Sequence, residues 1–92
     1  MTEAQVERYL ITCVTERGGM LRKVRWIGRR GCPDRFIMWP TRGYGHWVEL
    51  KSPIGKLSAP QIREIARLRA SGQTVHVLSM RGEVDHYIRE NA

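Results

Sequence analysis

The sequence predicts a mixed α/β fold, in which helices pack on one mixed sheet and the elements follow the order αβββαβα. Three observations lead to this prediction: two helix-initiating patterns, a short turn between two apolar runs, and a strand, helix and strand in succession near the C-terminus. Residues 1–92 make a single domain, near the lower limit at which a chain buries a sufficient core. With no apolar run near the roughly 20 residues that span a bilayer, we expect no membrane segment.

The first helix is predicted from about Glu3 to Arg17. Thr2 followed by Gln5 is a capping-box pattern, which satisfies backbone groups at a helix start. Apolar residues then recur at helical spacing as far as Val14, and Gly18 ends the pattern. One face of this helix should therefore lie on the core.

Three strands are predicted next, at Met20–Ile27, Arg35–Trp39 and His46–Ser52. The first mixes apolar and basic residues, so it reads as a strand with one basic face. The segment between the second and third strands is short and rich in Gly and Pro. Such a connection predicts an antiparallel hairpin.

A second capping box begins at Ser58, with Gln61 three residues later, and its helix extends to Gly72. Thr74–Ser79 then alternates apolar and polar residues, as a strand does. A strand, a helix and another strand form a crossover, so this last strand should run parallel to the third. A short helix over Glu83–Glu90 closes the chain.

The chain carries a net charge of +7, from 16 basic and 9 acidic residues. Most of the basic residues fall between Arg17 and Lys56, an asymmetry that favours a polyanionic partner such as nucleic acid. A basic surface that is merely solvated is the alternative. The candidate phosphate-binding residues are Arg22, Lys23, Arg25, Arg29, Arg30, Arg35 and Lys56.

Three charged residues, Asp34, Glu49 and Lys51, stand on or beside two adjoining strands, where such residues are rare. Glu49 and Lys51 are two apart in a strand, so they project from the same face. If the hairpin closes with Trp39 opposite His46, Asp34 falls on that face too, diagonally about 7 to 8 Å from Glu49. A slip of one residue would place Asp34 on the other face.

Two carboxylates held close repel each other unless one is protonated or a cation lies between them. Oxygen ligands beside a phosphate-attracting surface favour Mg²⁺ or Mn²⁺ over zinc. Lys51 would then supply a positive charge next to the reacting water or the developing transition state. A plain Glu–Lys pair on a wet sheet face, with an aspartate in a turn, is the structural alternative.

Pro33-Asp34 followed by Glu49-Leu50-Lys51 resembles the PD-(D/E)xK nuclease motif. The wider pattern "GCPD…HWVELKSPIGKLSAPQ…LRASGQTVHVL" resembles the VRR-NUC family of virus-type replication and repair nucleases. The likeness extends over nearly the whole chain. It implies a restriction-endonuclease-like fold and a metal-dependent nuclease.

The resemblance also implies a role for each matching residue. Asp34, Glu49 and the main-chain carbonyl of Leu50 match the metal ligands of the family, and Lys51 matches its catalytic lysine.

Two further positions match on the flanking helices. Gln61 matches a glutamine beside the active site, although the capping box also accounts for it. Glu7 matches the acid that the first helix adds to the metal shell, and Glu3 is its rival for that place.

The expected function is that of a structure-selective DNA endonuclease, dependent on Mg²⁺ or Mn²⁺, which resolves four-way (Holliday) junctions as a homodimer. The chain shows no recognition-helix signature, so base-specific cutting is not expected. The alternative is a non-catalytic nucleic-acid-binding subunit that keeps the nuclease fold. Either protein would work in the cytoplasm of a bacterial or phage-infected cell.

Overall fold

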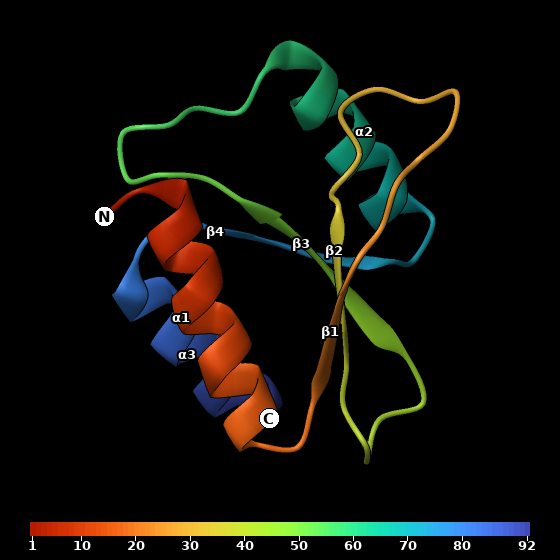
Figure 1. Ribbon diagram of the computed structural model, residues 1–92. Helices are drawn as coiled ribbons and strands as arrows, with labels where there is room; N and C mark the ends of the chain where they lie inside the picture. Colours follow the sequence, from red (N-terminus) through yellow and green to blue (C-terminus); the bar gives the residue numbers. More distant parts are fainter.

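The computed structural model describes residues 1–92 and confirms the predicted α/β class, a four-stranded mixed sheet between helices (Figure 1). The chain runs through α1 (Glu3–Glu16), β1 (Met20–Lys23), β2 (Arg35–Met38), β3 (Gly45–Leu50), α2 (Ala59–Ala70), β4 (Thr74–Leu78) and α3 (Arg81–Asn91). Both predicted capping boxes are present, with Thr2 at the start of α1 and Ser58 at the start of α2. None of the three helices is long and apolar enough to span a membrane.

The strands lie in the order β1-β2-β3-β4. The β1–β2 and β2–β3 pairs are antiparallel, and β4 runs parallel to β3, as the crossover through α2 requires. Hairpin and crossover were therefore both predicted correctly.

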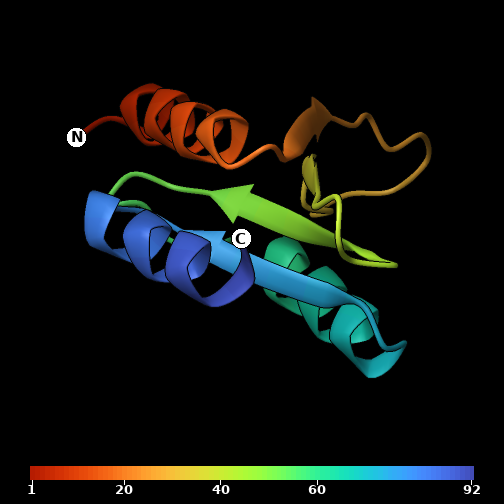
Figure 2. The ribbon, with the colours of Figure 1, turned by 90° about the horizontal axis from the view of Figure 1, so that it is seen from below.

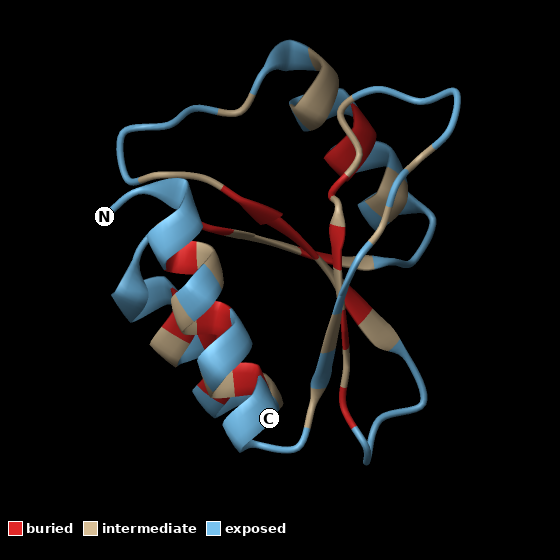
Figure 3. Cartoon of the chain, viewed as in Figure 1, coloured by how far each residue is buried: buried red, intermediate tan, exposed pale blue.

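Helices α1 and α3 lie side by side on one face of the sheet (Figure 1). Each turns its buried stripe toward the sheet, so that most buried residues of α1 face inward and its outer surface is exposed (Figure 3). This core is closed by strand residues that alternate along β3 and β2. Its eleven members are Val6, Leu10, Val14, Ile37, Trp39, Val48, Leu50, Leu78, Val84, Tyr87 and Ile88.

Helix α2 covers the other face of the sheet, with the strands between it and α1 (Figure 2). The apolar contacts here are fewer. The Trp47 ring packs on Trp26 and Phe36, with centroids 5.0 and 4.6 Å apart, and Val75 pairs with Trp47 in the sheet. Of α2 itself, Ile65 is the one apolar side chain that is fully buried.

The predicted hairpin register was wrong by two residues. Phe36 pairs with Trp47 and not with Glu49, because the turn closes earlier than expected: the Arg42 N–H donates to the Trp39 carbonyl, and strand pairing begins at Met38. A slip of two keeps every side chain on its predicted face.

The first strand is shorter than predicted, since β1 ends at Lys23. The chain then leaves the sheet, with positive φ at Gly28 and Gly31, and the Trp26 indole N–H donates to the Pro33 carbonyl, 2.8 Å away. We refer to residues 24–34 as the β1–β2 loop. It carries Arg25, which was expected on the first strand, together with Arg29 and Arg30, and it passes over the start of α2 (Figure 1).

Candidate active site

Asp34 and Glu49 come together at the point where β2 begins and β3 nears its end. Arg35 pairs with Val48 at the last pair of the ladder, and continuing this register by one residue would bring Asp34 opposite Glu49. The Asp34 carboxylate is close enough to Glu49 to raise the pKa of its carboxyl. The backbone of Asp34 is held on its other side, where its carbonyl accepts a 2.8 Å hydrogen bond from the Val24 N–H. Residues directly opposite in a sheet have Cβ atoms about 4.5 to 5.5 Å apart, closer than the predicted diagonal arrangement.

Glu49 is almost fully buried, with 8% of its surface exposed, although it is an acid on a strand. The pKa of its carboxyl is raised to about 7, chiefly by burial and also by the neighbouring Asp34 carboxylate, whereas Lys51 and Arg35 act to lower it. Lys51 is thus within electrostatic reach of Glu49, as their shared face predicts. The site holds a carboxyl whose charge the protein alone does not fully compensate, and a cation would do so.

The carboxylate of Asp34 is exposed on one side and paired on the other. Its Oδ1 lies 2.6 Å from Nη1 of Arg35, and the same guanidinium also binds Glu7 of α1. Arg35 is 8% exposed. It was expected on the phosphate-binding surface, but the structure encloses it between two carboxylates, where it links α1 to the site.

The two candidate acids of α1, Glu3 and Glu7, make different interactions. Glu7 binds Arg35, whereas Glu3, at the first position of the helix, raises the pKa of Glu49. Nowhere does the chain gather three or more His, Cys, Asp or Glu side chains in a metal-binding group. Asp34 and Glu49 therefore form a two-carboxylate site. Leu50 can add only its carbonyl, because its side chain is buried in the core.

Gln61 lies at the start of α2 and is used in the capping box. Its side-chain oxygen accepts a 2.8 Å hydrogen bond from the Ser58 N–H, and its side-chain amide nitrogen donates no hydrogen bond within the chain. The β1–β2 loop packs directly on this helix start: a Cβ on Gly31 would lie 2.5 Å from the Pro60 carbonyl carbon. The loop that leads into Asp34 is thus fixed against the helix that carries Gln61.

A cleft of about 490 Å³ opens beside Asp34, between β1 and the β1–β2 loop. Lys23, Arg25 and Arg29 line it together with Asp34, so three of the seven candidate phosphate-binding residues lie next to this carboxylate. Arg22, Arg30 and Lys56 are exposed and do not line this cleft.

Two features escaped the sequence analysis. Arg63 and Arg67 of α2 line a further polar cleft with the β1–β2 loop, and their spacing of four residues on one helix was a signal that could have drawn attention to them.

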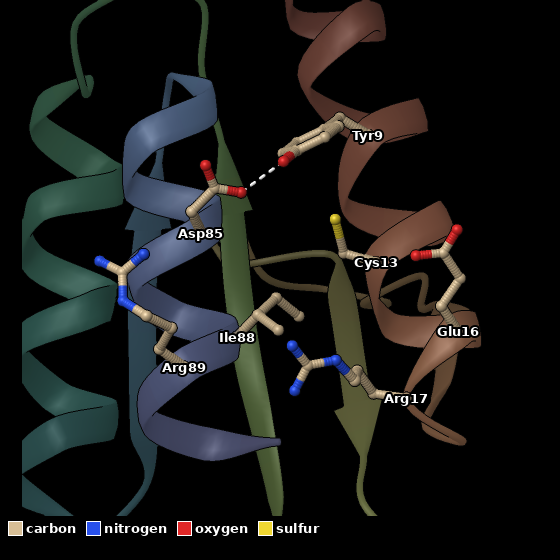
Figure 4. A pocket seen from close by; sticks show the side chains of 7 residues that line it. All are labelled: Tyr9, Cys13, Glu16, Arg17, Asp85, Ile88 and Arg89. Carbon is tan, nitrogen blue, oxygen red and sulfur yellow. Dashed lines mark hydrogen bonds between the residues drawn. The ribbon is translucent and has the colours of Figure 1, made fainter.

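The second feature is a hollow of about 250 Å³ between α1 and α3, which neither Asp34 nor Glu49 lines (Figure 4). There the Tyr9 hydroxyl donates to Asp85, which raises the pKa of Tyr9 to about 12. No local pattern in the sequence joins residues so distant along the chain.

Comparison with known proteins gives consistent results. The VRR-NUC domain matches residues 3–82. A protein of Acyrthosiphon pisum secondary endosymbiont phage 1, named "Putative nuclease p44", is 42% identical over 76 residues, which cover 83% of this chain and 81% of that protein. A solved structure described as "VRR_NUC domain" superposes with a TM-score of 0.86 at 32% identity, and the match covers both chains completely.

Proposed function

The chain belongs to the VRR-NUC nuclease family, and from this premise we propose that it is a metal-dependent endonuclease that hydrolyses DNA phosphodiester bonds. The observation that supports this most is the proximity of Asp34 and Lys51 to the buried Glu49 at one end of the sheet, since both act electrostatically on its carboxyl. The name of the phage relative points to the same activity.

Asp34, Glu49 and the carbonyl of Leu50 would hold Mg²⁺ or Mn²⁺. The chemistry of the donors suits these ions, because all are oxygens and the pKa of Glu49, raised to about 7, marks a site short of positive charge. When bound, such an ion polarises the phosphodiester and lowers the pKa of a coordinated water. Glu3 and Glu7 are the candidates for a further acid from α1. Glu3 already acts on Glu49, whereas Glu7 would first have to release Arg35.

Lys51 would place its ammonium group beside the phosphate that is attacked. There it stabilises the negative charge that develops on the phosphoryl oxygens, or orients the water. Gln61, on the neighbouring helix start, has an amide nitrogen free to donate to substrate while its oxygen caps the helix. The lysine and arginine side chains of the cleft beside Asp34 would hold the flanking phosphates.

We further propose that the substrate is branched DNA, a four-way junction above all, and that the chain acts as a homodimer. One site cuts one strand, whereas a two-fold pair presents two sites to two strands. Ile27 and Ile54 are more than 90% exposed and Ile62 is 56% exposed, so these isoleucines on two loops and on α2 offer apolar surface that a second copy could cover. Light scattering at twice the chain mass would support the dimer, and a stable monomer would exclude it.

The test is a panel of end-labelled substrates, namely linear duplex, flap, splayed arm and four-way junction, each incubated with Mg²⁺ or Mn²⁺ and with EDTA. Cleavage that needs the ion, with the junction nicked on opposing strands in preference to duplex, supports the proposal. Binding without cleavage under every ionic condition would instead favour the alternative, a nucleic-acid-binding subunit that keeps the nuclease fold. Equal cutting of linear duplex would remove the junction preference and leave the metal-dependent nuclease standing.

A further inference from the structure

A polar cleft of about 320 Å³ lies between the β1–β2 loop and the outer surface of α2. No hydrophobic residue lines it. Four arginines and one glutamate give its walls a net charge of +3. These residues are Arg29, Arg30, Arg63, Glu64 and Arg67.

Glu64 organises the cleft. Although charged, it is only 7% exposed, and both of its carboxylate oxygens accept hydrogen bonds from Nη2 of Arg29, at 2.9 and 2.6 Å. Arg67 approaches the same carboxylate at 3.6 Å. The pKa of Glu64 is lowered by these guanidinium groups, the Arg29 hydrogen bonds above all, so the glutamate stays charged and holds its partners in place.

The guanidinium groups keep most of their donors for another ligand. Each has five N–H donors, and Arg29 uses only those on Nη2 for Glu64. The side chain of Arg29 is 52% exposed and that of Arg67 is 61% exposed. Arg30 and Arg63 are also exposed and form no ion pair. One glutamate therefore fixes the geometry, and a surplus of cations faces solvent.

This cleft continues the one beside Asp34. Arg29 lines both, so a single guanidinium joins the proposed metal site to the arginines of α2. Gly31 fixes the intervening loop on the helix start, because its missing side chain lets the backbone lie against Pro60. The two clefts thus form one basic track from the carboxylates across the loop to α2.

We propose that Arg63 and Arg67, with Arg29 and Arg30, bind phosphates of the DNA backbone on an arm of the substrate outside the scissile step. Guanidinium groups match phosphate oxygens in bidentate geometry, and the track leads from the reacting phosphate toward its neighbours along the strand. This inference rests on the proposed function for the identity of the polyanion. It assigns to α2 a binding surface in addition to its place on the sheet.

The experiment measures fluorescence anisotropy of labelled duplex and four-way junction in EDTA, over a series of salt concentrations, for the full chain. Arg63→Ala combined with Arg67→Ala should weaken binding and reduce the slope of log affinity against log salt by about one to two units. The control combines Arg8→Ala with Arg89→Ala, the same loss of charge on exposed positions of α1 and α3, and it should bind like the wild type. Arg63→Ala alone removes no ion pair or hydrogen bond. It should reduce the salt slope by about half as much as the double variant does.

Single-turnover cleavage at saturating protein separates the two proposals. The double variant of α2 should cut at the wild-type rate once bound, because the carboxylate site is intact. Wild-type affinity and salt slope in that variant, or an equal loss in the control, would overturn this inference and leave the nuclease proposal standing. DNA binding that depends on Arg63 and Arg67 without cleavage by the wild type would support this inference and reject the nuclease. A wild type that binds no DNA would overturn both.

Discussion

The two faces of the sheet differ in chemistry. The face toward α1 and α3 carries apolar side chains that join a core of eleven buried residues. The face toward α2 carries Asp34, Glu49 and Lys51 beside the rings of Trp26, Phe36 and Trp47. Both faces belong to the same four strands, and alternate residues of β3 serve one and then the other. Val48 and Leu50 stabilise the fold, and Glu49 between them lies in the site. The two faces can therefore be altered separately, by substitutions only one residue apart.

The largest effect is expected from Glu49→Gln. This change should lower the cleavage rate by about a thousandfold, because it removes one of the two carboxylates proposed to hold the metal ion. Stability above pH 7 should stay the same or rise, since the buried carboxylate is no longer forced to ionise. Single-turnover cleavage and urea unfolding measure the two quantities. A variant that lost activity by unfolding would place Glu49 in the core instead.

Leu10→Ala should have the opposite pattern of effects, a loss of stability with little loss of cleavage activity. Leu10 is completely buried in α1, and truncating such a residue costs about 2 to 5 kcal/mol of unfolding free energy. Cleavage per folded molecule should stay near the wild-type rate below the unfolding midpoint. If the cleavage rate of the folded fraction fell as far as in Glu49→Gln, the two faces would be coupled. They could then not be altered independently.

Gly31→Ala tests whether the β1–β2 loop must lie against α2. Its φ is +76°, and the added Cβ would meet the Pro60 backbone, so the loop must move away from the helix start. A displacement of about 1 Å near a reacting centre can cost a hundredfold in rate, and we expect a loss between about tenfold and a hundredfold. The assay is cleavage at saturating protein.

Gly28→Ala is the matched control for that substitution. Gly28 has nearly the same φ, +77°, but nothing lies within 4 Å of its added Cβ. The backbone strain of about 1 to 2 kcal/mol is common to both variants, so the difference between their cleavage rates isolates the contact with Pro60. Equal rates would mean that this contact does not position the site.

The smallest effect is a pH dependence of stability on the apolar face. His46 and His76 have ring centroids 5.5 Å apart, and burial lowers the pKa of both. Arg42 lowers the pKa of His46 further, as His46 and Arg69 do for His76. Below the ordinary histidine pKa of about 6.5 the unfolded chain binds protons that the folded chain resists.

The Glu49 carboxyl, with its pKa of about 7, acts in the opposite direction over the same pH range, so the test uses the Glu49→Gln background. There the free energy of unfolding should fall as the pH drops below about 6.5, with at most about 1.4 kcal/mol per pH unit from each histidine. Urea unfolding at several pH values measures the slope. His76→Phe should flatten it, because its Nε2 is buried without a hydrogen-bond partner. His86→Phe, at an exposed position of α3, is the control for the exchange of a histidine for phenylalanine.

The elements that depend on local patterns could be predicted from the sequence. Thr2 with Gln5 and Ser58 with Gln61 form the hydrogen bonds that their spacing predicts, because a capping box involves only neighbours along the chain. The faces of the strands were predicted as well, since alternation is local. The register of the hairpin was not predicted, because it depends on where the turn closes. Here the turn closes with a hydrogen bond from the Arg42 N–H to the Trp39 carbonyl, which no sequence pattern indicates.

Long-range pairing accounts for what was missed in the site. Asp34, Glu49 and Lys51 carry a motif, but nothing in the sequence indicates that Arg35 pairs with both Asp34 and Glu7. The bond between Arg29 and Glu64 likewise joins a loop to a helix 35 residues away. Such contacts follow from the packing of α1 and α2 on the sheet, which the order of elements alone does not determine.

Calorimetric titration with Mn²⁺ most directly tests the claim that the face toward α2 holds a catalytic metal. The wild type should bind the ion, Asp34→Ala should lose that binding, and Lys51→Met should keep it, since the lysine acts on the phosphate and not on the ion. Circular dichroism confirms that each variant is folded. Unchanged Mn²⁺ binding in folded Asp34→Ala would contradict the account, because the paired carboxylates would then not be the metal site.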